Sequence, residues 1–216
     1  MLFCGNLLPM KIQDAYTRWS ATYDTDRNGT RALDRRVTEN TLADRNCQNI
    51  LELGCGTGKN TALLNRIGRK VLALDFSPGM LQQAKTKLKT DHVFFVRADL
   101  TKPWPAKTGS FELVICNLVL EHIEDLDQIF NQVSKSLRAG GEFFVCELHP
   151  SWQYEGIKAN FRDEEETIVI DAFVHHLSDF TEAARKNGLS LKRMKEWWHE
   201  EDVNKPPRLV SFLFEK

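Results

Sequence analysis

Long hydrophobic runs are missing from the sequence. No stretch of about 18 apolar residues occurs, so no transmembrane helix is expected. The apolar start Met1–Met10 has no basic residue before it and no long apolar centre, which argues against a signal peptide. An excess of positive charge is missing too. The 29 Lys and Arg residues are balanced by 30 Asp and Glu residues, which favours neither nucleic acid nor a membrane surface as partner.

Closely spaced cysteines are also absent. The five cysteines are Cys4, Cys47, Cys55, Cys116 and Cys146, and no two have the short spacing of a metal clip or a redox pair. The last two lie inside apolar runs, where a thiol packs as a small hydrophobic group. We therefore expect free thiols, no metal site and a reducing, cytoplasmic compartment.

The most informative stretch is Ile50–Thr61, in which an apolar run ends at Gly54, Gly56 and Gly58. This pattern predicts a buried strand, a tight turn and the start of a helix. Glycines permit the sharp turn and let a ligand approach the backbone closely, because they have no Cβ atom. The helix start adds unpaired N–H groups and the positive end of a dipole.

Two phosphate-binding motifs are disfavoured by individual residues in this stretch. Lys59 stands where the dinucleotide fingerprint needs its third glycine. A phosphate-binding P-loop would need glycine in place of Leu53 and Ser or Thr in place of Asn60. Glu52, in the strand itself, would repel a pyrophosphate and attract an ammonium or sulfonium group. The turn thus favours a ligand without phosphates.

Apolar strands and helical segments alternate along the middle of the chain, which predicts a parallel sheet covered on both faces. The expected strands are 49–53, 71–74, 93–96, 111–116 and 142–148. The expected helices are about 30–46, 60–67, 78–88 and 126–137, with Gly140-Gly141 as the stop signal of the last. The length suits one domain over residues 1–216.

The two ends of the chain differ from this core. Residues 1–30 carry Tyr16, Trp19 and Tyr23 at helical spacing, either as plain packing or as an aromatic lid over a ligand. Residues 149–176 break the alternation and predict an inserted cap with a possible strand at 167–173. A helix at 178–187 follows, and segments 189–198 and 209–215 are typical of a closing antiparallel pair.

Polar residues end each predicted strand. They are Glu52, Asp75, Asp99, Asn117 and His149. Ligands of open parallel sheets bind beyond the carboxyl ends of the strands, where these side chains would meet. Asp75 follows the glycines by about 20 residues, the spacing of a carboxylate that accepts both ribose hydroxyls.

The same edge has further groups suited to an adenosine. Phe76 can pack on a purine, and Asp99 can accept from its exocyclic amine. Structural alternatives are a helix cap for Asp75, a turn for Asp99 and a buried salt bridge for Glu52.

These motifs together resemble the class I S-adenosylmethionine-dependent methyltransferases, close to their small-molecule type 11 and type 25 groups. The matching segments are 52–58, 74–81, 97–100, 111–117 with 120–123, and 137–141, and the resemblance spans roughly residues 12–148. Glu112 departs from the Asp that is usual there. The resemblance implies a Rossmann-like α/β fold, a doubly wound sheet of seven strands in the order 3-2-1-4-5-7-6. Strand 7 would be antiparallel, and a small cap would be added.

The resemblance also implies S-adenosyl-L-methionine as cofactor, with S-adenosyl-L-homocysteine as its product. Glycines 54–58 would hold the methionine part, Glu52 its ammonium, Asp75 the ribose, and Asp99 with Leu100 the adenine. The full set of expected cofactor contacts is Tyr16, Tyr23, Glu52, Gly54, Cys55, Gly56, Gly58, Asp75, Phe76, Met80, Asp99, Leu100, Asn117 and His122.

A methyl acceptor with an O–H or protonated N–H group needs a base, because only the deprotonated atom attacks. The catalytic candidates are His149, His175, His176 and Tyr154, and His149 could equally serve only to bond the backbone. Glu121 and His122 are further candidates for the base, with packing and capping of the following helix as the alternative role. The aromatic residues of the cap suit an apolar or planar acceptor, a cation, or simply a core for the cap.

We therefore expect a methyltransferase (class EC 2.1.1.-) acting on an oxygen or nitrogen of a small molecule by in-line displacement. The protein would be a monomer or homodimer. The alternatives are an RNA or protein methyltransferase of the same fold, or a cofactor-binding protein without turnover.

Overall fold

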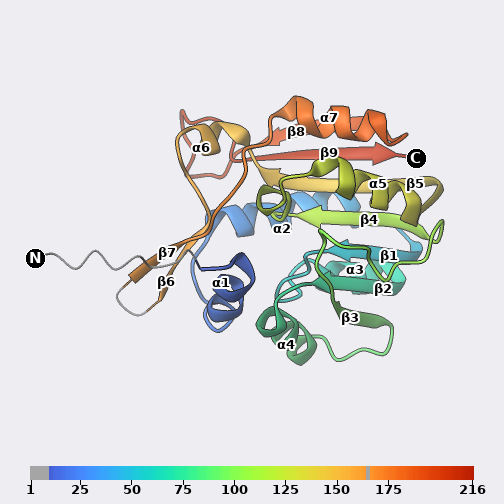
Figure 1. The fold of residues 1–216 in the computed structure, drawn as a ribbon, viewed down its shortest axis with the longest axis horizontal. Helices are drawn as coiled ribbons and strands as arrows, with labels where there is room; N and C mark the ends of the chain where they lie inside the picture. Colours follow the sequence, from blue (N-terminus) through green and yellow to red (C-terminus); the bar gives the residue numbers. More distant parts are fainter. Residues whose placement is uncertain (1–9, 164–165) are drawn as a thin grey trace, which may run out of the picture.

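A seven-stranded mixed sheet forms the centre of the protein (Figure 1). The computed structural model describes residues 10–163 and 166–216. The strands of this sheet are β1 (Cys47–Leu53), β2 (Gly68–Asp75), β3 (Val93–Arg97), β4 (Phe111–Asn117), β5 (Leu137–Leu148), β8 (Ser190–Trp197) and β9 (Leu209–Glu215). Their order is β3-β2-β1-β4-β5-β9-β8, and β9 is antiparallel to both neighbours. With β8 and β9 as strands six and seven, the predicted order is confirmed.

Helices cover both faces of the sheet, and two hydrophobic clusters fill the space beneath them. On one face lie α2 (Gly29–Leu42), α3 (Thr61–Ile67) and α4 (Pro78–Lys87). On the other lie α5 (Leu126–Ser136) and α7 (Leu177–Lys186), with α5 in front of the sheet and α2 behind it in Figure 1. Burial on both faces explains why the strands read as continuous apolar runs rather than alternating ones.

Local sequence signals set the helix boundaries. The hydroxyl of Ser77 accepts a hydrogen bond from the backbone N–H of Met80 (3.2 Å), and Pro78 occupies the first helical position of α4. Asp125 caps α5 in the same way through the N–H of Gln128 (3.1 Å). Because both caps lie just after the carboxyl edge of the sheet, they place the helix starts next to the strand ends.

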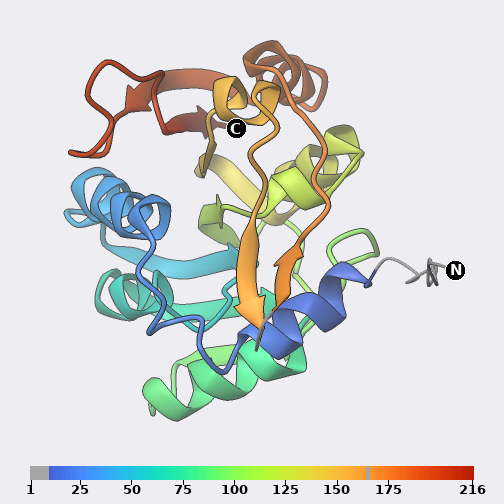
Figure 2. The ribbon, with the colours of Figure 1, turned by 90° about the vertical axis from the view of Figure 1, so that its left-hand side faces the viewer.

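The predicted cap forms a separate β-hairpin, made of β6 (Asn160–Asp163) and β7 (Glu166–Val169), after the short helix α6 (Pro150–Tyr154). The hairpin runs beside α1 (Ile12–Trp19) (Figure 2). The rings of Trp19 and Phe161 stack there with centroids 5.1 Å apart. The N-terminal segment and the cap thus share one small hydrophobic cluster.

Two local predictions were wrong. Gly140-Gly141 is not the stop signal of α5, because the helix already ends at Ser136. Strand β5 begins at Leu137 and includes both glycines, next to a shift in its register with β4. The possible strand at 167–173 ends at Val169, the last residue with a partner in β6. Cys4 and the stretch before Met10 lie outside the described residues.

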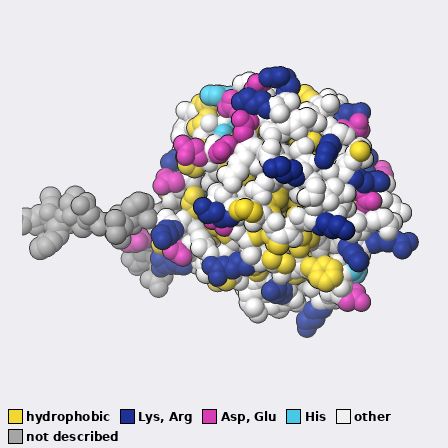
Figure 3. Space-filling model, turned by 45° about the vertical axis from the view of Figure 1, so that its right-hand side comes forward, with side chains coloured by type: hydrophobic (Ala, Val, Ile, Leu, Met, Phe, Trp, Pro, Cys, Tyr) yellow, Lys and Arg dark blue, Asp and Glu magenta, His cyan; other side chains and the backbone are white. Residues whose placement is uncertain are grey.

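The surface and the helix lengths bear on possible partners. Among residues 10–163 and 166–216, no helix is long and apolar enough to cross a membrane. On the face shown in Figure 3, Lys and Arg side chains are spread out, with hydrophobic and acidic side chains between them. That face presents no continuous basic patch of the kind that binds a nucleic acid backbone.

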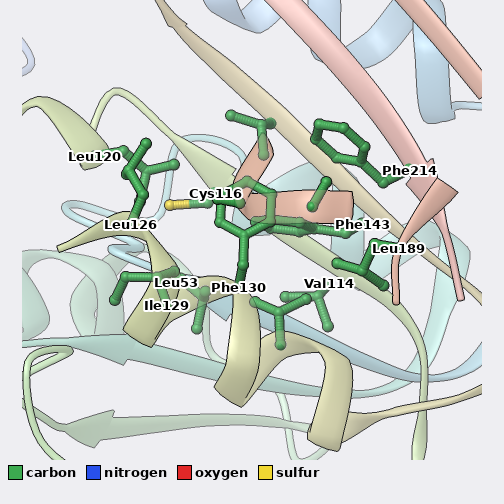
Figure 4. Packing of buried hydrophobic residues seen from close by; sticks show 14 of the residues in the cluster. Leu53, Val114, Cys116, Leu120, Leu126, Ile129, Phe130, Phe143, Leu189 and Phe214 are labelled. Atoms are coloured by element: carbon green, nitrogen blue, oxygen red, sulfur yellow. The ribbon is translucent and has the colours of Figure 1, made fainter. Parts of the chain in front are cut away.

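Phe130 of α5 lies at the centre of the larger hydrophobic cluster (Figure 4). Its side chain is fully buried, and its ring meets Phe143 and Phe214 edge-on at 5.3 and 5.6 Å between centroids. The contact joins α5 to the neighbouring strands β5 and β9.

We predict that Phe130→Ala lowers the free energy of unfolding by about 3–5 kcal/mol, since it leaves a cavity that cannot collapse. Phe94→Ala is the matched control, because half of the Phe94 side chain is exposed on the edge strand β3. It should cost less than about 1 kcal/mol. Urea denaturation would measure both, and equal losses would contradict the assigned packing.

Candidate functional site

A central cavity lies at the carboxyl edge of the sheet and encloses about 730 Å³, part of it open to solvent. It is lined by residues that follow β1, β2, β3 and β4, together with α1. The lining residues are Ile12, Tyr16, Tyr23, Gly54, Gly56, Asp75, Phe76, Met80, Ala98, Asp99, Leu100, Thr101, Asn117, Leu118, Val119, His122 and Ile123. Eleven of the fourteen expected cofactor contacts are among them; Glu52, Cys55 and Gly58 are not.

The glycine turn after β1 has the backbone that its sequence predicts. Gly54 has φ +70°, and a Cβ atom there would lie 2.2 Å from a methyl group of Val119. Gly56 has φ +53° and faces the open cavity, with no heavy atom near its missing Cβ. The turn therefore needs Gly54 for packing and leaves room for a ligand at Gly56.

Asp75 joins the turns after β1 and β2. Its carboxylate accepts the backbone N–H of Gly56 (2.8 Å) and of Ser77 (2.8 Å). Burial raises the pKa of Asp75 to about 6, although the N–H groups of Ser77 and Gly56 act in the opposite direction. The helix cap proper is Ser77, so Asp75 is not the cap that the alternative interpretation proposed.

Phe76, Met80, Asp99 and Leu100, four of the residues expected around the cofactor, line the central cavity. Asp99 also forms the turn that the alternative interpretation proposed. Its Oδ1 accepts from the backbone N–H and the hydroxyl of Thr101, at 2.9 and 2.7 Å. The side chain nevertheless stays exposed at the cavity wall, where its other oxygen can meet a ligand.

An inner cavity of about 450 Å³ adjoins the glycine turn. Two carboxyl groups, Asp34 and Glu52, and two cations, Arg31 and Lys59, line it. Glu52 accepts from the hydroxyl of Thr61 (2.6 Å) and has no ion pair, so the salt-bridge alternative does not apply. Burial raises the pKa of Glu52 to about 8 and lowers the pKa of Lys59 to about 8.

Asp34 was missed by the sequence analysis. From α2, its carboxylate accepts from the side-chain amides of Asn117 (2.5 Å) and Asn60 (3.0 Å), and burial raises its pKa. The sequence did contain a signal for Asp34. Asp34 and Thr38 are four residues apart, and each directly follows an apolar residue of the predicted helix. Such a pair lies on the buried side of a helix, where polar groups need partners.

Tyr16 and His122 form a hydrogen-bonded pair in the wall of the central cavity. The Tyr16 hydroxyl lies 2.7 Å from Nε2 of His122, and Nδ1 of His122 lies 3.0 Å from the carbonyl oxygen of Asp171. Because that carbonyl can only accept, Nδ1 carries the proton and Nε2 accepts from Tyr16. Burial raises the pKa of Tyr16 well above its usual value, which keeps the hydroxyl protonated.

A cap cavity of about 730 Å³ lies on the other side of Tyr16. It is enclosed by α1, the start of α2, the turn after β4 and the cap. Its lining residues are Tyr16, Trp19, Tyr23, Asn28, Thr30, Arg31, Leu118, Glu121, Leu148, Ile157, Lys158, Ala159 and Asn160. Tyr16, Tyr23 and Leu118 line the central cavity as well, so they form a shared wall. Leu118 has φ +55°, a backbone conformation that a leucine adopts only under constraint.

The four residues predicted as catalytic lie away from both cavities. Nδ1 and Nε2 of His149 bond Ser151 (2.7 Å) and Glu196 (3.0 Å). Tyr154 and His176 bond each other on the surface at 2.6 Å. None of these three residues lines the central or the cap cavity, because each is turned toward α6, α7 or β8.

His175, the fourth predicted catalytic residue, holds the turn after β4 instead. Its Nε2–H donates to the carbonyl oxygens of Leu120 (3.2 Å), the first residue of the short helix η1 (Leu120–His122), and of Ile123 (2.8 Å), the residue after it. Glu147 holds the same turn from β5, since its Oε1 accepts the N–H groups of Val119 (3.0 Å) and Leu120 (3.1 Å). Burial raises the pKa of Glu147 well above its usual value.

Residues 51–145 match the model of a methyltransferase domain. The structure also aligns with an S-adenosylmethionine-dependent methyltransferase from Listeria monocytogenes at a TM-score of 0.74 and 20% identity, over 86% of this chain and 99% of the other. These findings support the resemblance of the chain to the class I S-adenosylmethionine-dependent methyltransferases. Another structural neighbour is a geranyl diphosphate methyltransferase in complex with S-adenosylmethionine, at a TM-score of 0.64 and 15% identity, over 85% of this chain and 84% of the other.

Two curated relatives cover different shares of the chain. The methyltransferase is 28% identical to an uncharacterised methyltransferase of Emericella nidulans, over 82% of this chain and 75% of the other. It is 31% identical to the demethylmenaquinone methyltransferase of Clavibacter sepedonicus, over 65% of this chain. It spans only 59% of that bacterial relative.

The donor groups of the central and inner cavities fit S-adenosylmethionine. The inner cavity combines carboxyl groups with cations, as an amino acid end with both charges requires. The central cavity combines a buried carboxylate at Asp75 with the apolar side chains of Phe76 and Met80. Within the described ranges, no group of three His, Cys, Asp or Glu side chains could hold a metal ion.

We predict that Gly54→Ala weakens binding of S-adenosylhomocysteine at least about tenfold, because the new methyl group displaces Val119 at the cavity wall. Gly109→Ala is the matched control: Gly109 also has positive φ (+62°), but no atom lies near its Cβ position. The control keeps the backbone strain, about 1–2 kcal/mol, without the clash. Calorimetry would compare the affinities, and equal loss in both variants would refute the packing argument.

Proposed function

We propose that this methyltransferase transfers a methyl group to a nitrogen or oxygen atom of a small molecule held in the cap cavity. One observation carries the proposal: the cap cavity and the central cavity share a wall that contains Tyr16, and Tyr16 is bonded to His122. The cap cavity is lined by apolar, aromatic and a few polar side chains, the mixture typical of small-molecule sites. An acceptor there would lie beside the methyl donor and beside a base.

The cofactor contacts are proposed from the geometry of the cavity. Asp75 would accept hydrogen bonds from the ribose hydroxyls, and Asp99 would accept from the adenine amine. Glu52 and Asp34 would face the ammonium, and Arg31 and Lys59 the carboxylate. The proposed contacts include Asp34 and Arg31, which were not among the cofactor contacts expected from the sequence. Only the tertiary structure brings them to the inner cavity.

His122 is proposed as the base in place of the four residues predicted from the sequence. Its Nδ1–H is held by the carbonyl of Asp171, so the lone pair of Nε2 points to the wall between the cavities. A proton from the acceptor would reach Nε2 once the Tyr16 hydroxyl turns aside, or through that hydroxyl. A positioned base of this kind contributes about 10²–10⁴ to a rate.

When bound, S-adenosylmethionine would supply a methyl group attached to a sulfonium. The rest of the cofactor would leave as a neutral thioether. Since the leaving group needs no proton, the protein has to align the acceptor, exclude water and accept one proton. The aromatic side chains of α1 and the hairpin beside them would exclude water, and the constrained backbone of Leu118 would fix the separation of the two ligands.

Assays of methyl transfer with labelled S-adenosylmethionine also test other classes of acceptor. The Clavibacter relative is named for a quinone precursor, so a quinol belongs among the compounds tested. Label transferred to tRNA at moderate salt, with none on metabolites, would favour an RNA methyltransferase. No labelled product in any fraction would favour a binding protein without turnover.

We predict that Asp75→Asn weakens binding of S-adenosylhomocysteine about ten- to a hundredfold, because an amide cannot accept from both ribose hydroxyls while bonding Gly56 and Ser77. With the pKa of Asp75 at about 6, the carboxylate that accepts these bonds is lost as the pH falls. Wild-type affinity should therefore drop between about pH 7.5 and about pH 5.

Calorimetry at both pH values would test this prediction. Asp91→Asn is the control, because the Asp91 side chain is fully exposed outside the central cavity. It should match wild type at each pH. An Asp75→Asn variant with wild-type affinity would contradict the ribose assignment.

We predict that His122→Gln lowers the rate of methyl transfer about 10²–10⁴-fold while S-adenosylhomocysteine still binds. The rate is measured with labelled S-adenosylmethionine and fractionated cell metabolites, followed by identification of the labelled product. His92→Gln, a half-exposed histidine before β3, is the matched control and should keep the rate. Full activity of His122→Gln would rule out His122 as the base.

A further inference from the structure

Glu121 is a buried carboxyl group with a free oxygen in the wall of the cap cavity. Only 7% of the residue is exposed. Among the residues that the structure describes, none hydrogen-bonds its Oε2, and Oε1 lies 3.8 Å from the ring nitrogen Nε2 of His122, which carries no proton. A buried carboxylate without a partner is costly, so an oxygen left free beside a cavity points to a ligand.

The position of Glu121 is fixed by its neighbours. The carbonyl oxygen of Glu121 accepts the backbone N–H of Phe173 (2.7 Å), which ties η1 to the segment after the hairpin. His175 bonds the carbonyl oxygens of the first residue of η1 and of the residue after it. The free oxygen is therefore held by a fixed backbone and does not belong to a loose loop.

The cations that line the cap cavity have partners of their own. Nζ of Lys158 lies 3.2 Å from Oδ1 of Asp171. The two terminal nitrogens of Arg31 donate to the carbonyl oxygens of Tyr23 and Asp26, the latter at 2.8 Å. Nε of Arg31 has no partner among the described residues, but Arg31 also lines the inner cavity, where the cofactor carboxylate is proposed. No protein cation in the cap cavity thus neutralises Glu121.

Aromatic rings surround the same space. Tyr16, Trp19 and Tyr23 line the cap cavity, with Trp19 and Tyr23 in edge contact at 4.7 Å between centroids. Aromatic faces attract cations, most strongly where water is excluded. The guanidinium of Arg31 already lies 4.0 Å from the Tyr23 ring, which shows that these rings accept a positive group.

We propose that the methyl acceptor is an amine, and that its protonated nitrogen is recognised by the carboxylate of Glu121 within the aromatic wall of the cap cavity. The inference rests on the proposed function and specifies its acceptor. Because Oε1 of Glu121 lies close to Nε2 of His122, a nitrogen held by Glu121 would lie beside the base that must deprotonate it. Nitrogen rather than oxygen would then be the atom methylated.

The first test uses the intact wild-type protein saturated with S-adenosylhomocysteine and three probes of matched shape. These are phenethylamine, 2-phenylethanol and 3-phenylpropionate, which differ in charge at one end. We expect the amine to bind at least about tenfold more tightly than the other two by calorimetry. Equal or tighter binding of the alcohol or the carboxylate would overturn the proposal.

The second test compares Glu121→Gln with Glu124→Gln. The Gln variants keep the size of the side chain, and Glu124 is an exposed carboxylate three residues away that does not line the cap cavity. We expect Glu121→Gln to weaken amine binding about tenfold or more and to leave affinity for the alcohol unchanged, whereas Glu124→Gln should match wild type. S-adenosylhomocysteine affinity reports whether each variant is folded.

The outcomes separate this inference from the proposed function. Transfer of label to hydroxyl compounds, with amine binding unaffected in Glu121→Gln, would overturn the amine assignment and leave the methyltransferase assignment in place. No binding of any probe and no labelled metabolite would count against the cap cavity as an acceptor site, and so against both. If Glu121→Gln loses S-adenosylhomocysteine binding, the wild-type comparison of the three probes alone decides.

Discussion

The site depends on carboxyl side chains that lie at the ends of parallel strands and accept backbone N–H groups from the next turn. Asp75, at the end of β2, holds the glycine turn after β1 and the start of α4 through two bonds of 2.8 Å. Glu147, near the end of β5, holds the turn after β4 through two more. Burial makes ionisation of both groups costly, so each N–H bond counts for more than it would at the surface. These hydrogen bonds therefore fix the turns that surround the cavity at the edge of the sheet.

The two sides of the shared wall are built differently. The central cavity rests on strand ends and helix caps, which are local and close to the core. The cap cavity includes residues of α1 and the start of the hairpin β6–β7, segments distant in the sequence that meet around Trp19 and Phe161. Under the proposed function, small changes in the cap could therefore alter the acceptor cavity without disturbing the cofactor cavity. Such an arrangement allows methyltransferases with similar cofactor motifs to act on different acceptors.

The histidines illustrate how far sequence position can guide a functional assignment. His149 ends a strand, as a base at this edge should, yet both its ring nitrogens bond Ser151 and Glu196. His122 follows β4 by only five residues, and its environment depends on Tyr16 and Asp171, which are 106 and 49 residues away. No local sequence pattern predicts hydrogen-bond partners that lie so far away along the chain. Glu121 was a candidate from its position in the sequence, but only the structure shows that its Oε2 has no hydrogen-bond partner among the described residues.

The sequence by itself determined the sheet order and most of the cofactor cavity. Gly54, Asp75 and Asp99 act through turns of a few residues, and the rule that parallel strands end at one edge brings those turns together. Only the tertiary structure decided which helix faces the inner cavity, and so revealed Asp34. It also showed that His175, a predicted base, hydrogen-bonds the backbone of the turn that contains η1. These outcomes follow from packing between segments far apart in the chain, where hydrogen-bond partners and burial, rather than residue type, set the role of a side chain.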